Sequence, residues 1–332
     1  MLTKTQYNYY SVNAMAAGVA SSVEKESPIL QLMPFMDVEG NAYAYNQEST
    51  EATAQWYSVG DTWVESAPVP VQRTTSLAIL GGDVDIDNFS QSTMSNYTDI
   101  RASQVEYKAK AIAHEWEKQF VWGGTTDTED DKSFEGLCEL IAHVETTTDA
   151  IDLDALTNSQ VNEQASASGV LTFLKLDETI DLIRPGRPDA LMMTRAARRY
   201  INYLSTVTSG SVLRVGTDEF GNFIEQYNGI PIYINDFINN NIQDGASSVL
   251  TIDSYDHSAT VASGYDNTII FGMKFGLNAL HGIQNGPLTT TDMGQLETKD
   301  AERVRIKWYT GLCLRSKLAA GCLINVLISM TA

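Results

Sequence analysis

The hydrophobic and polar positions of the chain change their spacing several times, and the longest regular stretch is helical. Apolar side chains recur every three or four residues over about residues 98–121, which is the period of an amphipathic helix. The stripe they form consists of Val105, Ala109, Ile112, Ala113, Trp116 and Phe120. Gly123-Gly124 breaks the pattern, so the sequence predicts one long helix that ends there.

Residues 41–80 alternate with the period of two that is typical of a long β-hairpin. Tyr43 and Tyr45 alternate with small residues, and Trp56 and Trp63 flank a Gly-Asp turn signal. A hairpin with exposed aromatic side chains and no evident third strand is marginally stable by itself. We expect it to pack either on a partner or on its own domain, and the pattern alone does not choose between these two.

The second strand of this hairpin is predicted within one β-rich run, Val69–Leu80, which ends at a pair of glycines. Pro68 and Pro70 restrict the run to the edge of a sheet, because proline has no N–H to donate to a neighbouring strand.

Asp83 to Asp87 alternates strictly, which places three carboxylates on one face of a strand. A calcium-binding EF-hand loop would need glycine and glutamate where the chain has Asn88 and Met94. The pattern therefore favours a solvated strand face over a calcium site.

The first 45 residues show no sustained period and indicate an extended arm. Within them, Pro28–Met36 is apolar but bracketed by prolines, so we expect it to lie against another surface. The alternative is that it forms a strand of the domain's own core.

Helices and strands alternate in the second half of the chain. We expect a helix from about residue 133, a loop at 160–168, a helix at 176–183, a buried strand at 190–193, a helix capped by Thr194, a hairpin within 208–222, and strands at 230–234 and 268–272. Residues 306–315 and 322–328 alternate most clearly, which predicts a two-strand ribbon at the end of the chain.

Composition and charge limit the classes of function. The chain has 332 residues, enough for one or two domains, and 22 Lys+Arg against 42 Asp+Glu give a net charge of −20. This net charge excludes the class of proteins that bind nucleic acid phosphates across most of their surface, because such binding needs Lys and Arg side chains. Three scattered cysteines argue against a disulfide framework, and no stretch resembles a membrane-spanning helix or a secretory signal, so we expect a chain made in the cytosol.

A search for catalytic motifs finds almost nothing. His114-Glu115 lacks the second histidine of a zinc protease motif, because position 118 is a lysine. We find no nucleophile elbow, phosphate-binding loop or metal-ligand spacing, and therefore predict no cofactor and no enzymatic activity. Arg195, Arg198 and Arg199 could bind an anion or a neighbouring subunit, although the pattern by itself favours a solvated helix face.

In their order along the chain, these elements resemble the major capsid proteins of tailed bacteriophages, which have the Hong Kong 97-type fold. The resemblance covers most of the chain and rests on element order together with short motifs. These are Phe120-Val121-Trp122-Gly123-Gly124, Tyr227 to Ile234, Ile269-Ile270-Phe271-Gly272, Asp300 to Gly311, and Ala319 to Val326.

The resemblance implies an α+β fold with five segments. They are an N-terminal arm (1–45), an E-loop hairpin (46–80), a peripheral domain (81–185) with a spine helix at 98–121, an axial domain (186–288), and a return to the peripheral domain (289–332) that ends in the C-terminal β ribbon.

The resemblance also implies a function and partners. The chain would assemble with copies of itself into pentamers and hexamers of an icosahedral shell, the virion capsid, in the host cytoplasm. The shell would enclose double-stranded DNA without reading its sequence, with separate scaffolding and portal proteins and in some cases a decoration protein. No membrane contact is implied.

Subunit contacts are expected from the hairpin and from basic side chains. The candidate interface residues are Trp56, Trp63, Arg73, Arg195, Arg198 and Arg199. Some capsid proteins of this kind cross-link through a lysine of the E-loop, but no lysine occurs here between Lys25 and Lys108, so we expect no such cross-link.

Two alternatives stay open at this point. The first is an encapsulin-like shell that stores an enzyme, although residues 1–23 lack the charged face of an amphipathic cargo-binding helix. The second is an acidic hydrolase with paired carboxylates such as Asp83 and Asp85, which no supporting histidine, cysteine or metal spacing favours.

Overall fold

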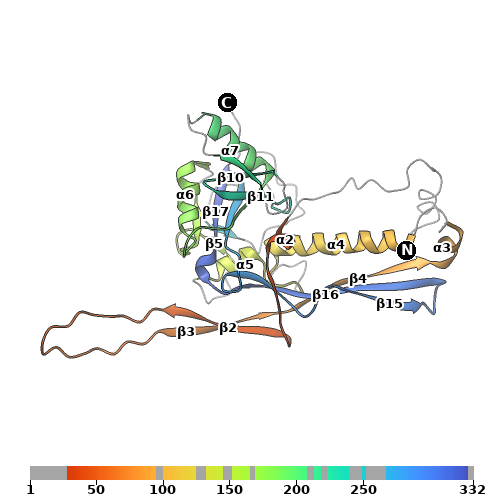
Figure 1. The fold of residues 1–332 in the computed structure, drawn as a ribbon, viewed down its shortest axis with the longest axis horizontal. Helices are drawn as coiled ribbons and strands as arrows, with labels where there is room; N and C mark the ends of the chain where they lie inside the picture. Colours follow the sequence, from red (N-terminus) through yellow and green to blue (C-terminus); the bar gives the residue numbers. More distant parts are fainter. Residues whose placement is uncertain are drawn as a thin grey trace.

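The computed structural model describes residues 28–94, 100–124, 132–144, 152–164, 169–207, 213–217, 223–238, 249–251 and 267–327. The fold is α+β, as predicted, with two large sheets, one long helix and one hairpin that projects from the rest (Figure 1).

A five-stranded sheet runs along the long helix α4 (Ile100–Trp122), which corresponds to the predicted helix at 98–121. The strands are β1 (Phe35–Asp37), β14 (Leu280–Gln284), β16 (Ala301–Leu314), β15 (Thr289–Gln295) and β4 (Ala78–Asp87), and β4 pairs with β16 over ten residues. The helix residue Val105 packs against a cluster formed by Val84, Ile86 and Val304 of the sheet. The alternating strands and the helix stripe thus place their apolar side chains on the two surfaces that meet.

An eight-stranded sheet forms the second layer. It consists of β6 (Val161–Glu163), β7 (Gly169–Val170), β17 (Ala320–Leu327), β13 (Asn267–Met273), β8 (Ala190–Met193), β11 (Ile230–Ile234), β10 (Phe223–Tyr227) and β9 (Leu213–Thr217). Its central strands β8 and β13 are buried at every position, so they read as continuous apolar runs.

Short elements complete the fold. They are α2 (Ile29–Leu32), α3 (Asn88–Met94), α5 (Leu137–Ala142), α6 (Phe173–Asp181), α7 (Arg195–Val207), a 3₁₀ turn (Lys317–Ala319), and the strand pair β5 (Asp152–Asp154) and β12 (Val249–Thr251).

Local signals explain several of the boundaries. The Thr194 hydroxyl accepts a hydrogen bond from the Ala197 amide at 3.2 Å, which confirms the predicted cap of α7. Asn228 and Gly229 have φ angles of 51° and 84°, as a tight turn between β10 and β11 requires. Helix α6 begins at Phe173, three residues before the predicted start, because Thr172 caps it.

The predicted C-terminal ribbon is wrong. Strands β16 and β17 both show the expected alternation, but β16 lies in the five-stranded sheet and β17 in the eight-stranded sheet, where it pairs with β13. The two strands are therefore separated between the layers, and β17 is buried on both faces at all but its last residue. An alternating sequence fixes which side chains share a face, but it does not select the partner strand.

The apolar stretch Pro28–Met36 belongs to the chain's own core rather than to another surface. Ile29 and Met33 are buried in the main hydrophobic cluster, and β1 pairs in parallel with β14. The alternative, a strand of the domain core, is correct for β1, whereas Ile29–Leu32 forms the short helix α2.

The run from Val69 to Leu80 is two strands rather than one. It divides at Leu77, whose amide bonds to the Asn41 carbonyl at 3.0 Å, into β3 (Val69–Ser76) of the hairpin and the start of β4. The predicted loop at 160–168 also contains a strand, β6, which pairs with β17.

Two of the three carboxylates of β4, Asp83 and Asp85, are paired with arginines and not merely solvated. On the neighbouring strand, Arg305 lies opposite Asp83 and Arg303 lies opposite Asp85. Each pair forms a bidentate ion pair, with guanidinium nitrogens 2.7–2.9 Å from the carboxylate oxygens. The arginines, which donate these hydrogen bonds, hold the pKa of both carboxyl groups below its usual range.

The long helix ends in a close backbone contact. Gly136 donates its N–H to the Gly123 carbonyl at 2.5 Å, and a Cβ on Gly136 would lie 2.5 Å from the Gly123 nitrogen. Glycine is therefore required here for close packing against α5.

Aromatic rings hold the centre of the molecule together. Trp116 of α4 lies 5.8 Å from Phe35, 5.9 Å from Trp308 and 5.7 Å from Phe134, measured between ring centroids. These rings join β1, β16, α4 and the segment before α5 into one core. Residues 1–27 and the acidic loop 127–131 lie outside the described residues.

Candidate assembly surfaces

The hairpin of β2 (Ala42–Thr50) and β3 (Val69–Ser76) extends from one end of the five-stranded sheet (Figure 1). Its strands pair from Ala42 opposite Ser76 out to Thr50 opposite Val69, and residues 51–68 form the loop beyond them. The predicted hairpin is therefore present, and its tip points away from α4 and from the eight-stranded sheet.

The base of the hairpin is held firmly. The Tyr45 hydroxyl donates to the Leu314 carbonyl at 3.2 Å, and the Gln47 amide donates to the same carbonyl at 3.0 Å. Tyr45 also packs against Ile283 and Cys313 in a small buried cluster. These contacts fix the direction in which the hairpin leaves the sheet.

Arg73, a predicted interface residue, takes part in this attachment. Its guanidinium donates to the His143 carbonyl at 2.5 Å, within the same chain. It also opposes the rise that burial causes in the pKa of Glu135. The structure thus places Arg73 at the hairpin base, and a contact of Arg73 with another subunit stays a prediction.

Burial alters the titration of other groups at the base. The pKa of His281, which lies opposite Cys313 and edge-on to Tyr43, is lowered because burial disfavours the charged ring. Burial raises the pKa of the Cys313 thiol to about 12. The His281 ring and the Cys313 thiol are therefore uncharged at neutral pH.

The tip of the hairpin has the opposite character. Trp56 is fully exposed, at 103% of its reference area, and Trp63 is 78% exposed. The Tyr57 and Trp63 rings lie 4.3 Å apart, and the Tyr57 hydroxyl accepts from the Val64 amide at 3.0 Å. The tip is thus ordered by its own contacts, while Trp56 points away from them.

The tip also carries net negative charge. Residues 51–68 contain Glu51, Asp61 and Glu65 and no Lys, Arg or His. The surface that receives this loop in an assembly should therefore offer apolar area together with at least one cation.

The arginines of α7 lie far from the hairpin in the fold (Figure 1). Arg195 makes a two-pronged contact with Asp236 at 2.9 and 3.0 Å, and Arg198 lies 3.9 Å from Glu225. Arg199 is exposed, and no residue of the described segments forms an ion pair with it. Of the three, Arg199 is the best placed to contact another molecule.

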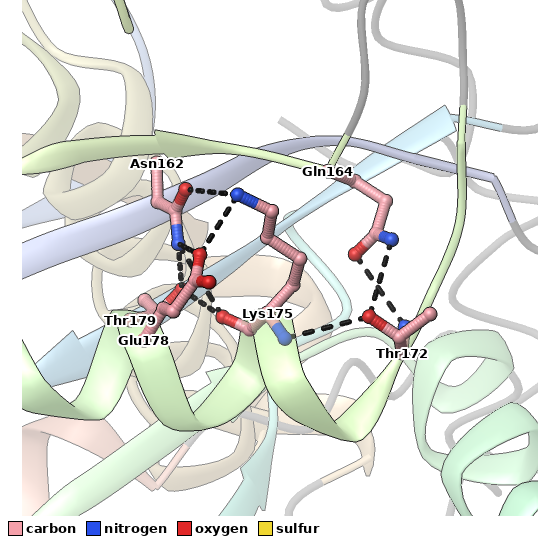
Figure 2. A network of polar contacts seen from close by, with 6 residues as sticks. All are labelled: Asn162, Gln164, Thr172, Lys175, Glu178 and Thr179. Atoms are coloured by element: carbon pink, nitrogen blue, oxygen red, sulfur yellow. Dashed lines mark hydrogen bonds and ion pairs between the residues drawn. The ribbon is translucent and has the colours of Figure 1, made fainter.

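A network of polar side chains joins α6 to β6 (Figure 2). The Lys175 ammonium donates to the Asn162 side-chain oxygen at 3.4 Å and lies 2.8 Å from a carboxylate oxygen of Glu178. This ion pair lowers the pKa of the Glu178 carboxyl. Thr172, the cap of α6, shares hydrogen bonds with Gln164 on the neighbouring segment. The partners are all internal, so this network braces the domain.

The described residues offer little for catalysis. The three cysteines are free and buried, and no group of three or more metal-ligating side chains occurs in the described ranges. Asp83 and Asp85, the candidate hydrolase pair, are both occupied by arginines. None of the helices in these ranges is both long and apolar enough to cross a bilayer.

Sequence reasoning found the exposed tryptophans but missed several residues that set their presentation. Tyr57, Gln47 and His281 were not singled out, although the adjacent pair Trp56-Tyr57 beside a turn was a usable signal. Gln47 bonds to Leu314, which is 267 residues away in sequence, and His281 lies opposite the buried Cys313 on the neighbouring strand. No local pattern reveals either contact.

No protein-family model matches the chain, and no curated protein matches its sequence. Solved structures do match. The holo-SrpI encapsulin complex from Synechococcus elongatus PCC 7942 has a TM-score of 0.67 at 14% identity, with 100% of this chain and 98% of that chain covered.

Two further structures match over similar lengths. The capsid of a native GTA particle has a TM-score of 0.62 at 13% identity, with 96% of each chain covered. Mycobacterium phage Bobi gives 0.59 at 14% identity, with 97% of this chain and 98% of that chain covered. The chain therefore has the fold that these capsid and encapsulin proteins share, which confirms the predicted Hong Kong 97-type architecture.

Proposed function

We propose that the chain is the structural subunit of an icosahedral capsid that encloses the double-stranded DNA genome of a tailed bacteriophage. The observation that carries the proposal is the exposed aromatic tip of a hairpin that is firmly anchored at its base, in a chain with the fold of capsid proteins. The subunits would form pentamers and hexamers around the domain that contains α7, and the hairpins would lie over neighbouring subunits.

Burial of the tip supplies a driving force of useful size. Each indole carries roughly 150–250 Å² of surface, which at about 25 cal/mol per Å² amounts to roughly 4–6 kcal/mol of gross stabilisation on burial. Association entropy removes part of this, so many such contacts must act together. A closed shell provides that repetition.

The acidic character of the chain supports a shell around DNA. A net charge of −20 gives a wall with little attraction for phosphates, so a packaged genome could slide during filling and release. The same charge makes subunits repel one another, and screening by salt should therefore favour assembly. Scaffolding, portal and decoration proteins would be separate chains, and the particle would be built in the host cytoplasm.

The test is electron microscopy of the expressed full chain at low and at raised salt, beside a variant in which residues 51–68 are replaced by the two-residue turn Asn-Gly. We expect pentamer and hexamer rings or closed particles from the full chain, in higher yield at raised salt. The variant should stay unassembled while its thermal unfolding is little changed. A full chain that remains monomeric at high concentration, or a variant that assembles equally well, would contradict the proposal.

A second candidate function is an encapsulin-like compartment, which the match to the Synechococcus elongatus encapsulin favours. The uncharged stretch at residues 5–23 favours the capsid instead, because a cargo-holding amphipathic helix needs a polar charged face. Particles purified from the native source separate the two functions: packaged DNA supports the capsid, and a co-purified protein cargo supports the compartment.

A further inference from the structure

A cavity of about 160 Å³ lies beside the base of the hairpin, where the start of β4 meets the second half of α4. It is lined by Ala78, Ile79, Leu80, Glu115, Trp116, Gln119, Lys132, Ser133 and Phe134. Ile79 and Lys132 are exposed, so the cavity opens to solvent between them.

The floor of the cavity is aromatic and rigid. Trp116 and Phe134 are 0% and 5% exposed, and their ring centroids lie 5.7 Å apart. The Trp116 N–H already donates to the Thr310 hydroxyl at 3.0 Å, so the ring cannot turn to fill the space. Apolar cavities of about 150 Å³ in other proteins accept a benzene ring, which indicates that this one has room for the six-membered ring of an indole.

The polar groups of the wall also suit an indole. The hydroxyl oxygen of Ser133 is buried and has no hydrogen-bond partner in the described part of the chain. An indole brings one N–H donor, which this oxygen could accept. Lys132 at the rim supplies the cation that the acidic loop 51–68 calls for.

We propose that this cavity receives Trp56 from the hairpin of a second copy of the chain. The inference rests on the proposed function, because it supplies the contact by which one subunit would hold the next. Trp56 of the same chain cannot enter: eight residue pairs, roughly 25 Å of ladder, separate the loop from the hairpin base beside the cavity. Trp56 is fully exposed at the tip, whereas the Trp63 ring packs against the tilted ring of Tyr57.

The test places a photo-reactive aromatic residue at the tip. Full-length chain carrying Trp56→p-benzoylphenylalanine is assembled, irradiated and digested, and the cross-linked peptides are identified by mass spectrometry. We expect cross-links between copies at the cavity wall, at residues 115–119 or 132–134. The matched control carries the same probe at Val59, which is equally exposed on the same loop but on the turn, and it should mark other residues.

The outcomes separate this inference from the proposed function. Particles whose cross-links map to another surface, or to a different protein, would contradict the proposal that Trp56 enters this cavity, but they would still support the proposed shell. Absence of any particle from the unaltered chain, assembled alongside, would overturn both.

A second variant tests the charge at the rim without disturbing the core. Lys132→Glu is compared with Lys299→Glu, since both lysines are exposed and both changes alter the net charge equally. We expect the yield of particles to fall at least severalfold further for Lys132→Glu. Equal yields would overturn the pairing of this rim with the acidic loop.

Discussion

The five tryptophans of the chain fall into two groups that the structure treats in opposite ways. Trp116, Trp122 and Trp308 are at most 9% exposed, whereas Trp56 and Trp63 stand in solvent at the hairpin tip. Each buried indole donates its N–H to a partner at 2.9–3.3 Å. The same side chain therefore stabilises the fold in the first group and is exposed to solvent in the second, where we propose that it contacts a neighbouring subunit.

The two groups of tryptophans differ in the contacts that surround them, and this difference shows which side chains stabilise the single subunit. The buried rings lie where four elements meet, so each is enclosed by residues distant in sequence. The tip has no core of its own. Its loop is held by local contacts, namely the tilted pair of Tyr57 and Trp63 rings and the turn in which the Ser58 amide donates to Asp61. Substitutions in the first group should act on folding, and substitutions in the second should act on assembly.

The largest effect is expected for Trp116→Ala. Removal of this ring leaves a cavity among Phe35, Phe134 and Trp308, and we expect the free energy of unfolding to fall by about 3–5 kcal/mol. Urea denaturation of the isolated subunit measures it. A loss below that of an ordinary surface substitution would show that the aromatic cluster is not a centre of stability.

A smaller effect is expected for Thr310→Val, which keeps the shape of the side chain but removes the acceptor of the Trp116 N–H. The buried donor is then unpaired, and unfolding should require about 1–3 kcal/mol less. Thr310→Ser, which retains the hydroxyl, is the matched control in the same denaturation experiment. If the two variants lose equal stability, the hydrogen bond is not the cause.

The hairpin base should respond to pH through His281. Because its pKa is lowered in the folded chain, the unfolded chain binds the proton more readily, and stability should fall as pH drops below about 6.5. One proton contributes a slope of at most about 1.4 kcal/mol per pH unit.

Other groups near His281 differ in sign or in range. The raised pKa of Glu135 acts in the opposite direction, and the lowered pKa values of Asp83 and Asp85 matter only below about pH 4. His281→Leu isolates the contribution: its unfolding free energy, measured from pH 7.5 to 5, should decline less than that of the unaltered chain. Parallel curves would contradict the assignment.

The smallest effect on folding is expected for Trp56→Ala. The side chain makes no contact that the subunit would lose, so the free energy of unfolding should change by no more than about 0.5 kcal/mol. The measurement is the same denaturation curve, read beside that of Trp116→Ala. A destabilisation of several kcal/mol would place Trp56 in the subunit core and remove the contrast between the two groups.

Much of the fold could be predicted from periodicity. The long helix, the Thr194 cap of α7 and the buried strands at 190–193 and 268–272 carry their signal in neighbouring residues, and they lie where the spacing placed them. The predictions that were wrong concern pairing. The ribbon of β16 and β17 and the single run through Leu77 failed because strands of equal pattern can join either sheet.

The candidate interface divides in the same way. The exposure of Trp56 and Trp63 could be predicted because these large aromatic residues flank a turn in a hairpin with no evident third strand. Arg73 and Arg195 looked equally available, but their partners, His143 and Asp236, lie 70 and 41 residues away in sequence. A charged side chain satisfied at such a distance cannot be distinguished from a free one without the structure.

The sequence by itself determined which faces are apolar, that α7 begins after Thr194, and that the hairpin tip would carry acidic and aromatic side chains, because these properties depend on residues within a few positions of one another. Only the tertiary structure decided which strands share a sheet, that Asp83 and Asp85 meet arginines, and that a cavity opens beside the hairpin base. Those features arise from the packing of segments that can lie more than two hundred residues apart, and packing selects among strand pairings that local patterns do not distinguish.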